Sequence, residues 1–377
     1  MGQSPKRIIE HMNHSQTSWS EYLKSELPKI AAFVAPYSII LSDDQPHTKG
    51  ERFLMQALTT TSGQKLILLG TETRTGKKVV IKATNEMAGR QEIAHERNCR
   101  TLLHKVDFSY DTFHSPNEII FLEKKGYTIF VTEFIEQDSS FLARPLEEQF
   151  SFALKALKAQ ERTRATTAKH LAQIKRVFGS RNSEDYLRMF DAFLITSKVK
   201  LGVPEVTKTL EQAFERLSAN KERITQYGNF LTHTDFVPHN FRISGDTFYL
   251  LDFSSLRFGN KHEGWARFLN FMTLYNPVLE ELLISYMEQN RSTEERKSLQ
   301  LMRFFRLGEI VAYYTNTLEK STNNLSTLNQ TRINFWAEVL KAELLNTRVS
   351  EEIVATYKNT RDELRSDEEK MRQVGLH

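Results

Sequence analysis

One polar run between two apolar segments carries the strongest chemical signal in the sequence. Residues 231–240 read LTHTDFVPHN, and a second apolar run, residues 248–251, ends at Asp252. The first run places the carboxylate of Asp235 and the amide of Asn240 on one short segment. A positioned carboxylate accepts a proton from a reacting hydroxyl, and carboxylate and amide oxygens are hard ligands that suit Mg²⁺. The two side chains therefore offer a proton acceptor and a ligand for a hard cation on one segment.

Each of these residues has an ordinary explanation when it is taken alone. Asp235 and Asn240 flank Pro238, and Asp and Asn are common turn residues. Asp252 follows an apolar run, where an Asp often ends a strand. Their shared order and spacing favour the chemical interpretation over three separate ordinary ones.

The loop and Asp252 resemble the catalytic and metal-binding segments of the protein-kinase-like superfamily. The form HTDFVPHN is closer to the H-G-D-x-x-x-x-N of the aminoglycoside phosphotransferase family than to the H-R-D of protein kinases. The resemblance covers about residues 53–270. It implies ATP as phosphate donor and Mg²⁺ as cofactor, with Asp235 as catalytic base and Asn240 and Asp252 as metal ligands. His233 then belongs to the catalytic loop, where we expect it to brace the loop.

The same resemblance assigns nucleotide contacts upstream. Lys82 ends the run Val79-Val80-Ile81-Lys82, which resembles the strand whose lysine contacts the ATP phosphates. A helix expected over residues 90–104 carries Glu92 and Glu96, one turn apart on one face. The family spacing to a leucine, here Leu103, favours Glu96 as the partner of Lys82, with Glu92 as the alternative.

Two further segments would complete the nucleotide site. Residues 129–135 resemble the strand and hinge that line an adenine pocket, so the backbone of Glu133 and Ile135 would contact the adenine edge. The turn at residues 59–63 holds one glycine in place of a glycine-rich loop. Its backbone amides and the hydroxyls of Thr60, Thr61 and Ser62 would meet phosphate oxygens.

Departures from the protein-kinase pattern favour a small-molecule kinase. Ser254 replaces the glycine of D-F-G, and no A-P-E segment follows. Residues 259–266 loosely resemble the G-D-P-x-x-D-L-A of the phosphotransferase family, with Glu263 standing where that family has a structural Asp. Two alternatives stay open: a catalytically silent kinase-like scaffold that binds nucleotide or protein, and a protein Ser/Thr kinase.

The element pattern predicts an α+β, bilobal protein-kinase-like fold. We expect a helical extension over residues 1–50 and, over residues 51–136, a small antiparallel N-lobe with one main helix. Residues 137–377 predict a mostly helical C-lobe that contains the catalytic loop and hairpin at residues 231–256. Helices within 140–230 and 260–345, among them ones expected over 206–225 and 263–289, would build the acceptor pocket. Ser292 with Glu295 fits a capping box at the start of another helix.

Composition limits the partners. The 377 residues suit two domains or lobes, and a net charge of +4 with mixed signs gives no case for nucleic acid. The single cysteine, Cys99, suits a reducing cytoplasm. Residues 1–17 lack a signal-peptide core, and the longest apolar stretch, residues 30–41, is well short of the ~20 residues of a membrane span. We expect a cytoplasmic protein with no membrane partner.

The acceptor is predicted only as a small molecule with a hydroxyl group; a sugar, an amino alcohol and a nucleoside-like compound are equally open. An aminoglycoside would need clustered carboxylates, for which Glu280-Glu281 and Glu294-Glu295 are candidates by composition. Most aromatic residues of the C-lobe are expected in its core, because they recur at helical spacing. The charged stretch 350–372 predicts a helix on its own domain, and the oligomeric state cannot be read from it.

Overall fold

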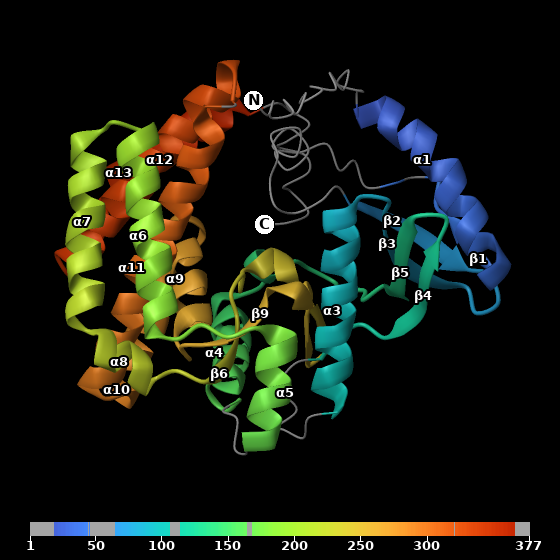
Figure 1. Ribbon diagram of the computed structural model, residues 1–377, viewed down its shortest axis with the longest axis horizontal. Helices are drawn as coiled ribbons and strands as arrows, with labels where there is room; N and C mark the ends of the chain where they lie inside the picture. Colours follow the sequence, from blue (N-terminus) through green and yellow to red (C-terminus); the bar gives the residue numbers. More distant parts are fainter. Residues whose placement is uncertain are drawn as a thin grey trace, which may run out of the picture.

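The computed structural model describes residues 19–43, 45, 65–105, 114–163, 168–319 and 321–365. These residues build a small lobe around an antiparallel sheet and a larger, mostly helical lobe (Figure 1). The predicted α+β, bilobal architecture is confirmed. The predicted phosphate contacts of Thr60, Thr61 and Ser62 lie outside the described residues.

The N-lobe sheet has five strands in the order β1-β2-β3-β5-β4, with antiparallel pairing throughout. The strands are β1 (Ile39–Leu41), β2 (Leu66–Glu72), β3 (Lys77–Thr84), β4 (Glu118–Lys124) and β5 (Tyr127–Glu133). The tight turn between β2 and β3 places Gly76 at φ 69°, a conformation that glycine adopts without strain. In this register Lys82 lies opposite Phe130 of β5 in the middle of the sheet.

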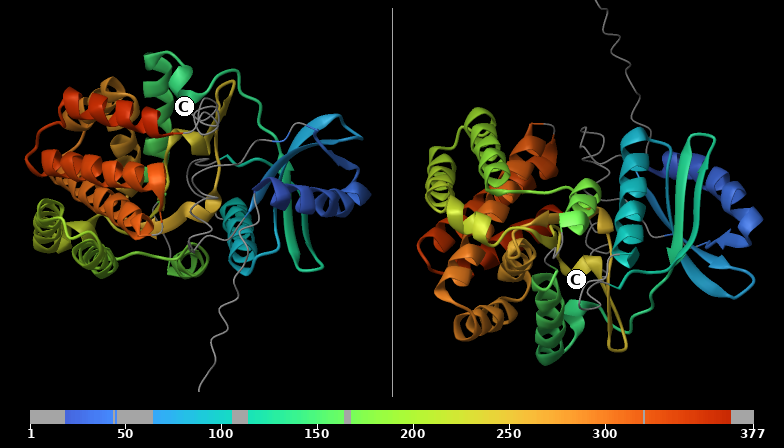
Figure 2. Two further views of the ribbon diagram at one scale, coloured as in Figure 1. Left: turned by 90° about the horizontal axis from the view of Figure 1, so that it is seen from above. Right: turned by 60° about the horizontal axis from the view of Figure 1, so that its bottom comes forward.

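Alternation along β5 gives the sheet two buried faces. Ile129 and Val131 pack into a core shared with α1 (Trp19–Val34). Phe130 points the other way, and the guanidinium of Arg100 in α3 (Met87–Lys105) lies 5.1 Å from its ring centroid. The sheet is therefore covered by α1 on one face and by α3 on the other. In both views of Figure 2, α3 lies between the sheet and the helical lobe.

The expected N-terminal helix forms as α1, which joins the N-lobe core. Ile30 and Val34 are fully buried against the sheet, and Tyr127 donates a hydrogen bond of 2.5 Å to Glu26. A 3₁₀ turn, η1 (Ala35–Tyr37), then leads into β1, a strand that sequence periodicity did not reveal. Residues 19–41 thus complete one face and one edge of the sheet.

The C-lobe is built from ten helices within the described residues. They are α4 (Leu146–Glu161), α5 (Ala168–Phe178), α6 (Ser183–Lys200), α7 (Pro204–Ala219), α8 (Lys221–Gln226), α9 (Glu263–Tyr275), α10 (Pro277–Asn290), α11 (Thr293–Leu318), α12 (Asn323–Leu344) and α13 (Glu351–Leu364). The predicted capping box of Ser292 and Glu295 opens α11.

Two helices expected to be continuous are divided. The helix expected over 206–225 is broken at Asn220 into α7 and α8. The helix expected over 263–289 is broken at Asn276, where Pro277 starts α10 and the Asn276 side chain accepts a hydrogen bond from Leu279 N. Proline lacks the N–H that would continue α9, whereas it is well suited to a helix start.

Short strands interrupt the helices between α8 and α9. β6 (Phe230–His233) pairs with β9 (Leu256–Gly259), and β7 (Phe241–Ser244) pairs with β8 (Thr247–Leu250). Two 3₁₀ turns, η3 (Pro238–Asn240) and η4 (Phe253–Ser255), follow β6 and β8, while η2 (Phe141–Ala143) precedes α4. The predicted hairpin is confirmed as β7–β8, and its turn places Gly245 at φ 55°.

The largest apolar cluster fills the C-lobe beneath these strands. Trp265 and Phe268 of α9 are fully buried in it, as are Tyr186 and Phe190 of α6. This agrees with the expectation that most C-lobe aromatic residues form the core. No helix in the described ranges has the length and apolar character needed to cross a membrane.

Candidate active site

The loop from β6 to η3 holds Asp235 and Asn240 together. Asn240 Nδ2 donates to the backbone oxygen of Asp235 at 2.8 Å and to its Oδ2 at 3.1 Å. These two bonds use both N–H groups of the amide. Asn240 Oδ1 is therefore left as an acceptor on the loop, which is the atom that a hard cation would bind.

The carboxylate of Asp235 is held from the side by Arg267 of α9. Arg267 Nε and Nη2 lie 3.0 and 2.9 Å from Asp235 Oδ1, and His239 Nε2 lies 3.8 Å from Oδ2. Burial raises the pKa of Asp235, but the charge of Arg267 and the neighbouring His239 outweigh burial and hold that pKa well below its usual value. Asp235 is an ionised acceptor at neutral pH.

His233 ties the loop to the Asp252 segment. Its fully buried ring places Nε2 3.1 Å from the carbonyl oxygen of Leu251 and 3.0 Å from that of Asp252. Both partners are acceptors, so Nε2 carries the proton and donates to them. Burial lowers the pKa of His233, which keeps the ring neutral. These contacts are those of a brace, as expected.

Asp252 has an unusual backbone conformation, and its carboxylate accepts hydrogen bonds from nearby hydroxyl groups. Its φ and ψ are 56° and 58°, rare for a residue other than glycine. Ser254 and Ser255 donate to its two carboxylate oxygens at 2.6 and 3.0 Å. Burial raises the pKa of Asp252, but the charge of Lys82 and the hydrogen bond from Ser254 lower it to about 2. Ser254, at the position of the D-F-G glycine, is thus a direct donor to the carboxylate.

Lys82 and Glu96 form the predicted ion pair. Lys82 Nζ lies 2.8 and 2.7 Å from the two carboxylate oxygens of Glu96, whose side chain is 4% exposed. The alternative partner, Glu92, instead pairs with Lys65 at the start of β2. Of the two carboxylates on this face of α3, Glu96 is therefore the one bound to Lys82.

The segment after β5 is pinned to its neighbours but leaves one donor open. Phe134 N donates to Lys78 O at 3.1 Å, and the Glu133 carboxylate accepts from Asn117 N and Nδ2 at 2.8 and 3.0 Å. The backbone N–H of Ile135 has no hydrogen-bond partner within the described part of the chain. This donor is available to a planar ligand edge.

The catalytic loop has a support that sequence reasoning missed. Gln160 Oε1, in α4, lies 3.2 Å from both His233 N and Thr232 Oγ1, each of which donates to it. Gly264 makes room for this amide, because a Cβ at that position would lie 2.2 Å from Gln160 Oε1. A lone glutamine in a helix gives no sequence signal of such a role.

Glu263, expected where the phosphotransferase family has a structural Asp, stabilises the start of α9. It is fully buried and accepts hydrogen bonds from Tyr186 at 2.5 Å and from Arg181 at 2.6 Å, and it pairs with Arg306 at 3.4 Å. These partners come from α6, from the segment before it and from α11. Glu263 therefore fixes the start of the helix that carries Arg267.

The four carboxylates considered for an aminoglycoside pocket are already paired. Their partners are Arg303 for Glu280, Arg348 for Glu281, Arg223 for Glu294 and Lys261 for Glu295. Glu295 is also part of the α11 capping box. Composition suggested these residues, and in the structure each of them already has a cationic partner within this chain.

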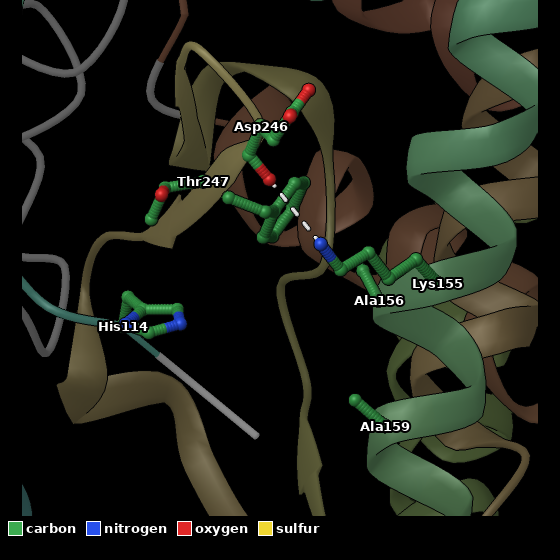
Figure 3. Close-up of a pocket in the computed structure, with 7 residues that line it drawn as sticks. His114, Lys155, Ala156, Ala159, Asp246 and Thr247 are labelled. Atoms are coloured by element: carbon green, nitrogen blue, oxygen red, sulfur yellow. Dashed lines mark hydrogen bonds between the residues drawn. The ribbon is translucent and has the colours of Figure 1, made fainter. Parts of the chain in front are cut away.

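A small pocket lies apart from the candidate residues (Figure 3). It encloses about 110 Å³ beside the β7–β8 hairpin, and Lys155 Nζ donates across it to Asp246 O at 3.2 Å. Its lining consists of His114, Lys155, Ala156, Ala159, Asp246, Thr247 and Phe248. None of the residues predicted to act in phosphoryl transfer lines it.

The oxygen donors present suit Mg²⁺ in their chemistry. Asp252 offers a carboxylate and Asn240 an amide oxygen, the hard ligands that Mg²⁺ prefers. The described residues contain no group of three or more His, Cys, Asp or Glu able to hold a metal. Mg²⁺ commonly uses one or two protein ligands and completes its shell with waters and substrate phosphates. The two oxygens therefore fit an ion that arrives with a nucleotide.

The sequence matches no protein-family model and no curated protein. Solved structures do match. An aminoglycoside phosphotransferase bound to ADP and hygromycin B is 13% identical, with a TM-score of 0.57 over 82% of this chain and 98% of that one. A macrolide 2′-phosphotransferase from Brachybacterium faecium is 11% identical, with a TM-score of 0.53 over 82% and 98% of the two chains. A spectinomycin phosphotransferase bound to ADP and spectinomycin is 15% identical, with a TM-score of 0.52 over 88% and 98%. This chain therefore has the protein-kinase-like fold shared by the aminoglycoside, macrolide and spectinomycin phosphotransferases.

Proposed function

We propose that the protein is an ATP-dependent phosphotransferase that moves the γ-phosphoryl group to a hydroxyl of a small molecule. One observation carries this proposal. Lys82 of the N-lobe, bound by Glu96, lowers the pKa of Asp252 of the C-lobe through its charge. This supports a site in which a cation suited to phosphate lies near a carboxylate suited to Mg²⁺.

Asp235 would act as the base. The acceptor hydroxyl donates a hydrogen bond to its carboxylate, and the hydroxyl oxygen attacks the γ-phosphorus. As that bond forms, the bond from the γ-phosphorus to the bridging oxygen of ADP breaks, and the hydroxyl proton passes to Asp235. A weakly basic carboxylate suits this reaction, because a loose transition state needs positioning more than early proton removal.

The other residues would bind and orient the nucleotide. Lys82 would contact the α- and β-phosphates, and the backbone of Glu133 and Ile135 would receive the adenine edge. Asn240 Oδ1 and Asp252 would hold Mg²⁺, which neutralises phosphate charge when bound. The hydroxyls of Thr60 and Ser62 are proposed phosphate donors. His233 would keep the loop and Asp252 in register.

The proposal rests on site chemistry as well as on fold. The fold alone hosts active enzymes and silent scaffolds. A scaffold has no need of an ionised Asp235 and an ionised Asp252 beside Lys82, whereas phosphoryl transfer uses all three. The structural neighbours act on small hydroxyl compounds, as their bound hygromycin B and spectinomycin illustrate. We therefore favour a small-molecule acceptor over a protein.

A thermal-unfolding experiment tests the nucleotide site first. Wild type and Asp252→Ala are unfolded with ADP or ATP, with and without Mg²⁺. A ligand at 100 times its dissociation constant stabilises by ~2.7 kcal/mol, which gives a clear shift. We expect a Mg²⁺-dependent shift in wild type that is lost in Asp252→Ala. No shift with any purine nucleotide would refute the proposal in favour of a silent scaffold.

A further inference from the structure

Arg267 contacts the proposed base from a helix that contains none of the catalytic motifs. Its Nε and Nη2 both reach Asp235 Oδ1, at 3.0 and 2.9 Å. Nε donates a hydrogen bond to that oxygen, and Nη2 is in ion-pair contact with it. Oδ2 accepts a hydrogen bond from Asn240 at 3.1 Å and lies 3.8 Å from His239 Nε2. Both carboxylate oxygens are thus held, and Arg267 is one of the residues that position the proposed base.

The guanidinium keeps donors beyond this contact. An arginine has five N–H groups, and the hydrogen bond to Asp235 uses Nε–H. The four N–H groups on Nη1 and Nη2 have no hydrogen-bond acceptor within the described ranges of the chain. They are not enclosed either: the Arg267 side chain is 18% exposed, and none of its nitrogens belongs to the buried unpartnered atoms. A cationic edge is thus presented beside the base.

Phosphoryl transfer concentrates negative charge at this place. The three equatorial oxygens of the transferring group carry charge in the transition state, and cationic N–H donors that meet them lower the barrier. The group must pass beside Asp235, because the base and the attacking hydroxyl are in contact. Arg267 is the arginine bound to Asp235, and its planar fork suits phosphate oxygens as well as a carboxylate.

We propose that Arg267 is a catalytic residue that binds Asp235 Oδ1 with one edge and the transferring γ-phosphoryl group with the other. This inference rests on the proposed phosphotransferase function. It gives Arg267 two tasks. The residue holds the carboxylate of Asp235 in position, and it supplies positive charge where the γ-phosphate is received and transferred.

Binding measurements separate the phosphate contact from a merely structural role. Calorimetry would give the dissociation constants of ADP and AMP-PNP, each with Mg²⁺, for wild type, Arg267→Gln, Asp235→Asn and the double variant. Only AMP-PNP carries a γ-phosphate. The decisive comparison is made in the Asp235→Asn background, because this substitution removes the carboxylate. Without Arg267, that carboxylate would repel the γ-phosphate and weaken AMP-PNP binding relative to ADP by itself.

We expect Arg267→Gln in the Asp235→Asn background to weaken AMP-PNP about tenfold or more relative to ADP, the usual effect of losing a charge-assisted hydrogen bond. Arg291→Gln is the matched control. Arg291 makes a 2.7 Å ion pair with Glu161 and is 20% exposed, close to the 18% of Arg267. The control should leave the ratio of the two affinities unchanged.

The outcomes are distinguishable. If Arg267 only braces Asp235, its substitution in the Asp235→Asn background leaves the AMP-PNP to ADP ratio unchanged, and the inference is overturned while the nucleotide site stands. If wild type binds neither nucleotide with Mg²⁺, the proposed function fails and this inference fails with it. Urea unfolding checks that each variant is folded. Should Arg267→Gln not fold, Arg267→Lys, which keeps the charge but loses the fork, replaces it in the Asp235→Asn background. A loss of AMP-PNP affinity relative to ADP is expected there, and an unchanged ratio overturns the inference.

Discussion

The Lys82–Glu96 pair allows the structural and functional roles of one lysine to be separated. Lys82→Met keeps the aliphatic stem but removes the charge that faces Glu96. The Glu96 side chain is 4% exposed and that of Lys82 is 19% exposed. Removing one partner of a buried pair costs ~3–5 kcal/mol, because the other charge is left without compensation. Since Lys82 keeps some contact with solvent, we expect about 3 kcal/mol.

The same strand provides a matched control. Lys78 of β3 pairs with Glu136 at 3.0 Å, but these side chains are 64% and 71% exposed. Exposed pairs contribute ~0–1 kcal/mol, so Lys78→Met should change the free energy of unfolding little. The comparison holds residue type, strand and substitution constant and varies the burial of the pair.

A double variant completes the experiment. Lys82→Met with Glu96→Met removes both charges, so stability should return to within ~1 kcal/mol of wild type. The Mg²⁺-dependent nucleotide shift should be absent in both the single and the double variant, since neither keeps the phosphate contact. Urea unfolding measures the first quantity and thermal unfolding with Mg²⁺ and ATP the second. Equal costs for Lys82→Met and Lys78→Met would refute the reasoning about burial, and a nucleotide shift restored in the double variant would refute the phosphate role.

Three further outcomes follow from the site. Asp235→Asn should lower ATP turnover by ~10²–10⁴ while the Mg²⁺–ADP thermal shift survives; normal turnover would remove Asp235 as the base. The pKa of Asp252 falls from 3.8 to about 2. This shift contributes ~2.5 kcal/mol of stability above pH ~4, and the contribution is lost as pH falls toward 2. Urea unfolding at pH 5 and pH 3 should show the difference in the free energy of unfolding between wild type and Asp252→Asn shrinking by about half. Gly264→Ala should destabilise by ~1–3 kcal/mol through its clash with Gln160; a more stable variant would show that helix propensity, ~1 kcal/mol in favour of alanine, outweighs the clash.

The parts of the site that local sequence encodes could be predicted. Asp235 and Asn240 share one loop, so their spacing fixes their separation. Lys82 lies on strand β3 and Glu96 on the next helix, α3, so a short connection brings them together. In each case the chain between the residues is short enough for the motif to imply the geometry.

The parts built from distant segments could not be predicted. Gln160 and Arg267 reach the catalytic loop from α4 and α9, far from it in sequence, and each belongs to a common residue type with no distinguishing neighbours. The ion pairs of the acidic residues at 280–281 and 294–295 could not be predicted for the same reason, because their partners lie on other elements. Composition identifies a charge, whereas only packing shows which charge neutralises it.

The substitution at the structural acid position has an electrostatic logic. Glu263 accepts hydrogen bonds from Arg181 and Tyr186 and pairs with Arg306. A neutral acceptor, Gln160, receives the backbone N–H of His233. A carboxylate in place of this amide would bring a negative charge to the segment two residues before Asp235, and like charges raise the pKa of neighbouring carboxylates. A neutral amide supports the loop without that repulsion of the proposed base.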